Sequence, residues 1–200
     1  MDRNILEQGI KYLKERHSID LRPQRFRVRI DNAKEALRQC LEMSMGHKVE
    51  WCDGYDEVAD WLTDSKGLGL MLIGNVGRGK TEICTKALPL IFGCCLNKIP
   101  HILPAVDLCT PQGYELSRRS HLLIVDDVGT EWQYNDYGTP HVVFSELVDR
   151  MERDKTLLIA NSNLTDIQIK ERYGTRTIDR LRSNMRIVVL DGESLRGRYI

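Results

Sequence analysis

Short apolar runs alternate along the chain with longer stretches in which apolar positions recur every three or four residues. The longer stretches predict amphipathic helices. Strands that alternate with helices favour a parallel sheet covered by helices on both faces. The short runs predict five β-strands, at residues 67–73, 101–106, 121–125, 156–160 and 186–190. We therefore expect an α/β fold with a central five-stranded parallel sheet.

The first fifty residues have a different pattern. Residues 4–16 and 31–45 predict two amphipathic helices, and residues 55–62 predict a third. Between the first two, arginines alternate with apolar residues, which is the period of a strand with one basic face. These arginines are Arg25, Arg27 and Arg29. We expect residues 1–50 to be a helical segment that binds a partner, and residues 51–200 to be the α/β domain.

Two prolines bear on the predicted helices. Thr139 and Pro140 predict the start of a helix, with Thr139 as the N-cap and Pro140 as the first helical residue. An apolar face follows them in the sequence. That face consists of Val143, Phe144, Leu147, Val148 and Met151. Pro89 lies inside another helical stretch, where proline kinks or ends a helix. We expect the helix near Leu88 to be short or bent.

Composition sets broad limits. The chain is 42% hydrophobic and 29% charged, as in a soluble globular protein with one main core. The six cysteines form no C-x-x-C pair, so we expect reduced thiols and no zinc. The sequence has neither a long apolar span nor the pattern of a signal peptide, so we expect a cytoplasmic protein with no membrane partner. Net charge is zero, although residues 11–38 and 170–198 are basic.

A glycine-rich motif follows the first predicted core strand. Its glycines let the backbone curl around phosphates, and the helix after it adds the positive end of its dipole. The lysine would reach the β and γ phosphates of a nucleotide, and the threonine hydroxyl would be a ligand of Mg²⁺. The motif consists of Gly74, Asn75, Val76, Gly77, Arg78, Gly79, Lys80 and Thr81. It predicts an ATP-binding P-loop.

Two carboxylates follow the strand at 121–125. Ligands of a parallel sheet bind at the carboxyl ends of its strands. We expect Asp126 to hold Mg²⁺ through water, and Asp127 to orient or deprotonate the water that attacks the γ phosphate. Glu131, four residues further on, could replace or assist Asp127.

A second polar segment, Asn-Ser-Asn, follows the strand at 156–160. An asparagine there can hydrogen-bond the γ phosphate or its water and so distinguish ATP from ADP, although the same residues are common in turns.

Residues 175–182 predict a short helix that carries three arginines. An exposed arginine could reach the γ phosphate of a neighbouring subunit and stabilise the transition state. A solvated basic face, or an internal ion pair with Asp179, would explain the pattern equally. The arginines are Arg176, Arg180 and Arg182. Arg196, after the last strand, could contact phosphates of its own subunit.

The order and spacing of these segments resemble the AAA+ ATPases. Residues 125–131, 160–164 and 177–182 are similar to the DnaC, DnaI and IstB branch of helicase loaders. The resemblance covers roughly residues 53–198. It implies a Walker A motif at 74–81, and it implies the following roles: Asp126 and Asp127 as Walker B, Asn163 as sensor 1, Arg180 as the arginine finger and Arg196 as sensor 2.

The same resemblance implies ATP and Mg²⁺ as cofactors, an ATP-dependent oligomer, a replicative helicase as partner and binding of single-stranded DNA. It also implies an AAA+ fold without a C-terminal lid domain. The chain departs from the family in one catalytic residue, because the usual second Walker B acid is glutamate. The shorter Asp127 predicts slow hydrolysis.

Three alternatives remain open from the sequence. An IstB-like transposition helper would share the ATPase core but bind a transposase and prefer duplex DNA. A small P-loop kinase would transfer phosphate to a metabolite or nucleotide. A non-hydrolysing adaptor would use ATP only as a switch.

Overall fold

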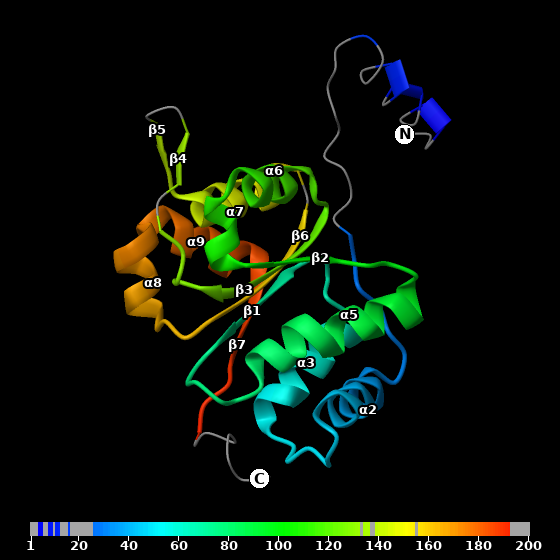
Figure 1. Ribbon diagram of the computed structural model, residues 1–200. Coiled ribbons are helices and arrows are strands. Elements are labelled where there is room, and N and C mark those ends of the chain that lie inside the picture. The colour runs from blue at the N-terminus through cyan, green and yellow to red at the C-terminus, as the bar shows by residue number, and fades with distance from the viewer. Residues whose placement is uncertain are drawn as a thin grey trace.

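The five apolar runs form one parallel sheet in the computed structural model (Figure 1), with strand order β2-β3-β6-β1-β7. The structure describes residues 26–132, 134–136, 139–154 and 156–192, and also residues 4–5, 8–9, 11–12 and 16. The predicted five-stranded α/β fold is confirmed. The strands are β1 (Gly69–Ile73), β2 (His101–Pro104), β3 (Leu122–Val128), β6 (Leu157–Ser162) and β7 (Met185–Val189).

Helices cover both faces of the sheet (Figure 1), so the central strands β1 and β6 are buried on both sides. The helices α2 (Ala33–Met45), α3 (Asp53–Thr63) and the helical run after β1 cover one face, whereas α7 (Val143–Asp154), α8 (Asp166–Tyr173) and α9 (Thr175–Asn184) lie on the other. Side chains of β1 alternate between the two cores: Leu70 and Leu72 join the first, Met71 and Ile73 the second. The helix α6 (Pro111–Arg119) follows a 3₁₀ turn at Ala105–Cys109.

The helical run after β1 continues past Pro89. It consists of α4 (Lys80–Glu82), a π-helical turn (Ile83–Ala87), α5 (Leu88–Ile91) and a second π-helical turn (Phe92–Leu96). Of the two alternatives, a short or a bent helix, the first was therefore wrong. The wide turn directly before Leu88 changes the hydrogen-bond pattern where proline lacks an N–H, which allows the run to continue.

The region before residue 50 is part of the first core. Val28, Ile30, Leu37 and Leu41 are buried together with strand residues of the sheet. Residues 26–30 alternate between buried and exposed, as predicted, but they are extended backbone rather than a strand. They pair instead with the end of α3, because the N–H of Ile30 donates to the carbonyl of Leu62. The described residues between 4 and 16 are helical, Arg25 lies outside the described residues, and the domain division at residue 50 stays a prediction.

The helix predicted to begin at Thr139 and Pro140 begins later. Those residues lie in β5 (Thr139–His141), which pairs with β4 (Tyr134–Asp136) as an antiparallel hairpin. The helix α7 starts at Val143 and buries the predicted apolar face. A residue before proline favours extended backbone, and here the pairing with β4 prevails over the capping pattern.

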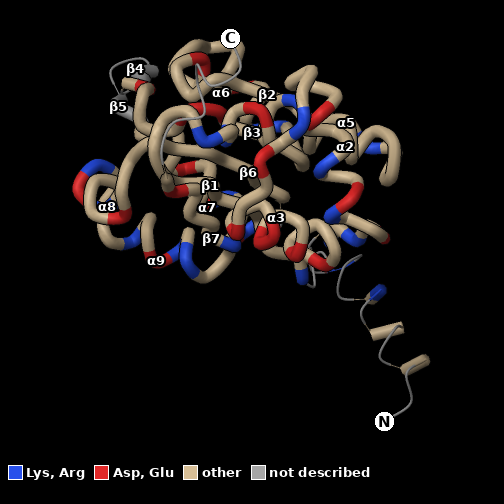
Figure 2. The backbone as a smooth tube through the Cα atoms, turned by 90° about the horizontal axis from the view of Figure 1, so that it is seen from below, with Lys and Arg blue, Asp and Glu red and all other residues tan. Residues whose placement is uncertain are grey.

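Charges of both signs are interspersed along the folded chain (Figure 2), so zero net charge does not arise from one basic and one acidic half. Among the residues that the structure describes, no helix is long and apolar enough to cross a membrane.

Candidate nucleotide-binding site

The glycine-rich loop joins the end of β1 to the helical run that begins at Lys80. Gly74, Gly77 and Gly79 have φ of 133°, 85° and 81°, which is the region that side chains disfavour. A Cβ at position 74 would lie 2.4 Å from the carbonyl oxygen of Leu190, and one at 79 would lie 2.7 Å from the hydroxyl of Tyr55. The loop is thus packed on one side against Leu190, which follows β7, and against α3, and its other side borders a cavity.

Lys80 is buried beside this loop, with only 5% of its surface exposed. Its ammonium donates to the carbonyl oxygens of Gly74 at 2.8 Å and Asn75 at 2.7 Å. A buried ammonium needs negative partners, and a phosphate would supply a stronger one than these carbonyls. The geometry therefore fits the predicted role of Lys80 toward the phosphates of a nucleotide.

The strand order brings the other polar segments beside this loop. Because β6 lies between β1 and β3, the carboxyl ends of all three strands are neighbours. The pairing of β3 with β6 shifts register between Val125 and Val128, so β3 has one extra residue at the acidic pair. Asp127 has φ of 57°, a left-handed conformation that is uncommon for aspartate. Such a bulge redirects a side chain, and it turns Asp127 toward the phosphate loop.

Asn161 organises the two acids. It is fully buried, its side-chain amide donates to the carboxylate of Asp126, and its side-chain oxygen accepts from the N–H of Asp127 at 3.0 Å. Asn163 is exposed at the cavity and donates to the carboxylate of Asp127 at 3.3 Å. Sequence reasoning placed the sensor at Asn163 and did not foresee the clamp at Asn161, since both asparagines carried the same turn signal.

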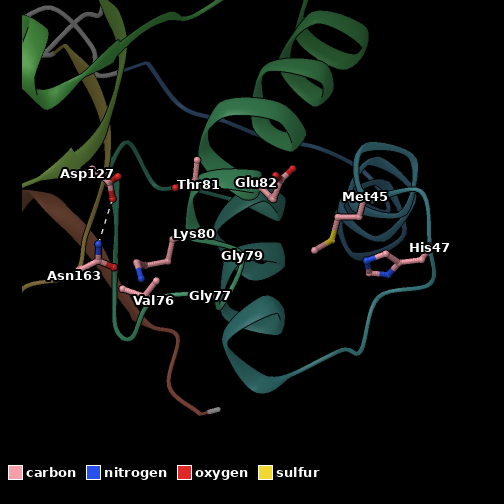
Figure 3. A pocket seen from close by; sticks show the side chains of 10 residues that line it. All are labelled: Met45, His47, Val76, Gly77, Gly79, Lys80, Thr81, Glu82, Asp127 and Asn163. Atoms are coloured by element: carbon pink, nitrogen blue, oxygen red, sulfur yellow. Dashed lines mark hydrogen bonds between the residues drawn. The ribbon is translucent and has the colours of Figure 1, made fainter. Parts of the chain in front are cut away.

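A cavity of about 400 Å³ connects these groups (Figure 3). Lys80, Thr81, Asp127 and Asn163 lie around one end of it, and Met45 and His47 at the end of α2 lie at the other. The size is typical of a small-molecule site. Its lining residues are Met45, His47, Val76, Gly77, Gly79, Lys80, Thr81, Glu82, Asp127 and Asn163.

The end of this cavity that lies away from Lys80 is lined by Met45 and His47. Tyr55 is buried under the phosphate loop, where its hydroxyl donates to the carbonyl of Arg78 at 3.3 Å. No motif in the sequence marked Met45 and His47, because only the packing of α2 brings them to this place.

Glu131 is not among the described residues that line this cavity. Its carboxylate accepts hydrogen bonds from the N–H of Gly129 at 2.8 Å and from the hydroxyl of Tyr173. It borders a separate cavity of about 300 Å³ with Trp132 and Arg172. Of these two acids, therefore, Asp127 lines the cavity beside Lys80 and Glu131 does not.

Arg176 and Arg180 lie on α9, which confirms the predicted helix. Arg180 is 27% exposed and forms ion pairs with Asp149 and Glu152 of α7, the second at 3.1 Å. Arg176 pairs with Asp149 at 3.2 Å, whereas Arg182 pairs with Asp166 of α8 at 2.7 Å. Both ion-pair partners of Arg180 are thus on α7, whereas the sequence suggested an internal pair of Asp179 with a nearby arginine. The role of Arg180 toward a neighbouring subunit stays a prediction, and Arg196 lies outside the described residues.

The five-stranded parallel sheet, with a glycine-rich loop after β1, has the fold of known solved structures. Among solved structures, the DnaC helicase loader is similar with a TM-score of 0.57 and 14% identity, over 78% of this chain and 99% of that one. DnaI is similar with a TM-score of 0.59 and 18% identity, over 82% of this chain and 93% of that one. The resemblance that the motifs suggested is thereby confirmed at the level of the fold. No protein-family model matches the chain, and no curated protein matches it in sequence.

Replacing Gly79 by alanine is expected to destabilise the protein by about 1–2 kcal/mol and to weaken ATP binding. Alanine would have to adopt the left-handed backbone of this position, and its Cβ would clash with the hydroxyl of Tyr55. Urea unfolding and ATP titration measure the two effects. Gly93 is the matched control, since a Cβ there meets nothing within 4 Å and helical alanine is favoured by about 0.5–1 kcal/mol. Equal stability of the two variants would contradict the close packing of the loop.

Proposed function

We propose that this protein is an ATP-hydrolysing AAA+ protein that works as a DnaC-like loader of a replicative helicase. The observation that carries the proposal is the single cavity that joins the phosphate loop to Asp127 and Asn163. A loop alone would bind phosphate, whereas an acid and an amide beside it supply what hydrolysis needs. The similarity to a structure named as a helicase loader supports the choice of partner.

Each residue has a defined task in this proposal. The loop and Lys80 bind the β and γ phosphates and neutralise their charge. Asp127 accepts a hydrogen bond from the attacking water and takes its proton, and Asn163 orients that water or the γ phosphate. The buried Asn161 holds Asp126 and the backbone of Asp127 at the required places.

Magnesium fits the oxygen groups present. Thr81 lines the cavity, and Asp126, which is held by Asn161, directly precedes the cavity-lining Asp127 in β3. A hydroxyl and a carboxylate are the oxygen ligands that Mg²⁺ prefers, and we assign these two residues to it. When bound, Mg²⁺ neutralises charge that develops on the phosphate oxygens.

Arg180 acts, in this proposal, on the nucleotide of a neighbouring subunit. The loss of Arg180 in an Arg180→Ala variant is expected to slow turnover by about 10³-fold, with ATP affinity unchanged, as for other arginine fingers. Arg176→Ala is the matched control, because it removes a neighbouring arginine that pairs with the same Asp149. Turnover is measured by phosphate release at a protein concentration that permits assembly.

A mixing experiment tests the direction of this contact. Subunits with Arg180→Ala keep their own phosphate loop, and subunits with Lys80→Ala keep Arg180. A mixture of the two is expected to regain turnover that neither has alone. If mixing restores nothing although the two variants assemble with each other in the presence of ATP, Arg180 does not act between subunits.

Single-stranded DNA is the proposed nucleic-acid ligand. Arginines exposed on two described segments, Arg27 with Arg29 and Arg118 with Arg119, could follow a phosphate backbone. Arg27 is engaged by Asp64 and Arg119 by Glu115, so each must exchange an internal partner for a phosphate. Binding should weaken steeply with salt and strengthen with ATP. Binding that ignores nucleotide would contradict a loader.

The partner test uses Asp127→Asn protein held with ATP, which is expected to bind nucleotide without turning it over. Capture of a replicative helicase supports the proposal, whereas capture of a transposase supports the IstB-like alternative. Two further assays address the remaining classes. Transfer of phosphate to a small molecule would indicate a kinase, and equal turnover in wild type, Asp127→Asn and Arg180→Ala would indicate a nucleotide switch. We propose a cytoplasmic location, in line with this role.

A further inference from the structure

Glu131 is a buried carboxylate for which the proposed chemistry has no direct use. It is 5% exposed and closes the loop that begins with the acidic pair. Its two oxygens accept from Gly129 and from Tyr173, and its backbone carbonyl accepts from the guanidinium of Arg172. Burying a carboxylate costs free energy unless such partners are present, so three contacts on one residue indicate a specific role.

Tyr173, which donates to Glu131, is held in place by its own packing. It is 8% exposed at the end of α8, and its ring packs against Phe144 of α7 with centroids 5.1 Å apart. Burial, together with the hydrogen bond to Glu131, raises the pKa of the Tyr173 hydroxyl. The hydroxyl therefore stays protonated at neutral pH and remains a hydrogen-bond donor.

The loop between Asp127 and Glu131 holds an unfavourable backbone conformation. Asp127 is left-handed, and its carbonyl accepts from the N–H of Thr130 at 3.2 Å and from its hydroxyl at 2.8 Å. Gly129 has φ of 107°, and a Cβ there would lie 2.6 Å from Leu164. A left-handed aspartate costs about 1–2 kcal/mol and persists only where its surroundings enforce it.

The hydrogen bonds of Glu131 help to hold Asp127 in this left-handed conformation. The N–H of Gly129 lies two residues after Asp127, and its bond to Glu131 ties the turn to α8. On the other side, Asn161 holds the N–H of Asp127 from β6. The turn is therefore fixed at both ends, by β6 at one and by α8 at the other.

We propose that Glu131 and Tyr173 are positioning residues that hold Asp127 in the orientation required for hydrolysis. This inference rests on the proposed ATPase function. A carboxylate displaced by about 1 Å can lose about a hundredfold in rate, although nucleotide binding at the phosphate loop is unaffected.

The test compares Glu131→Ala, Glu131→Gln and Tyr173→Phe in the full chain. Alanine removes both side-chain contacts, and turnover is expected to fall by about ten- to a hundredfold while ATP affinity stays within about twofold. Glutamine can still accept from Gly129 and donate to Tyr173, so it is expected to restore most of the turnover. Tyr173→Phe should lie between the two. The matched control is Glu171→Gln, because Glu171 is an exposed acid on α8, the helix that carries Tyr173.

A second measurement does not depend on catalysis. Without nucleotide, amide hydrogen exchange of residues 127–131 is expected to accelerate by at least about tenfold in Glu131→Ala and little in Glu131→Gln. If the wild-type protein does not hydrolyse ATP but exchange is still accelerated in Glu131→Ala, the proposed ATPase function is refuted. The role of Glu131 in holding the loop is then still supported. Unchanged exchange and unchanged turnover in Glu131→Ala would overturn the inference. Loss of turnover in Glu131→Gln with unchanged exchange would also overturn it, because the carboxylate would then act chemically.

Discussion

Replacing Lys80 by alanine is expected to lower ATP affinity by about a hundredfold or more and to reduce turnover below detection. The ammonium is already aimed into the phosphate loop by the carbonyls of Gly74 and Asn75. It would make two or more charge-assisted hydrogen bonds to phosphate, each worth about 1.5–3 kcal/mol, and about 1.4 kcal/mol corresponds to tenfold in affinity. Calorimetric titration with ATP and a phosphate-release assay measure the two effects.

The control for Lys80 is Lys98→Ala. Lys98 is exposed beyond the end of the same helical run, so its removal changes net charge equally without touching the cavity. That variant should match wild type in both assays. Wild-type ATP affinity in Lys80→Ala would show that the nucleotide binds elsewhere, and the assignment of the cavity would have to be abandoned.

Replacing Asp127 by asparagine is expected to lower turnover by about 10²–10⁴-fold, which is the usual contribution of a general base. ATP affinity should change little, because the loop and Lys80 remain intact. Asparagine is a suitable replacement, since it has nearly the same shape and tolerates the left-handed backbone found at this position. Single-turnover phosphate release separates the chemical step from binding.

The control for Asp127 is Asp60→Asn, which neutralises an exposed acid on α3 outside the cavity. It should hydrolyse ATP as wild type does. If Asp127→Asn kept full turnover while both Glu131 variants lost it, the water would have to be activated from the Glu131 side of the loop. The positions of the two carboxylates, one lining the cavity and one bound to Tyr173, argue for the opposite result.

The residues proposed to be catalytic could be predicted from the sequence to different degrees. Lys80 and Thr81 belong to a motif whose function depends on local backbone geometry, so their places could be predicted closely. Asp127 and Asn163 could be assigned only as polar ends of strands. Their 3.3 Å contact required the strand order, which no local signal encodes.

Some local patterns pointed to the wrong structure because distant contacts outweighed them. Thr139 and Pro140 have good capping chemistry, yet they pair with β4 in a hairpin. Pro89 predicts a kink or a helix end, and no end occurs there, because the apolar residues around it are buried in the first core and the run continues through π-helical turns. Propensities of a few tenths to about 1 kcal/mol per residue are smaller than the free energy of burying such side chains.

The sequence by itself determined the five strands, the helices between them and the phosphate loop. Apolar periodicity reports which faces are buried, and glycines at 74, 77 and 79 report a backbone that only glycine adopts easily. Only the tertiary structure decided which residues meet. It inserted β6 between β1 and β3, made Asn161 the clamp of the acidic pair, and brought Met45 and His47 to the cavity. It also bound Glu131 to Tyr173, away from the cavity. These outcomes depend on strand order and helix packing, which arise from long-range pairing rather than from neighbours along the chain.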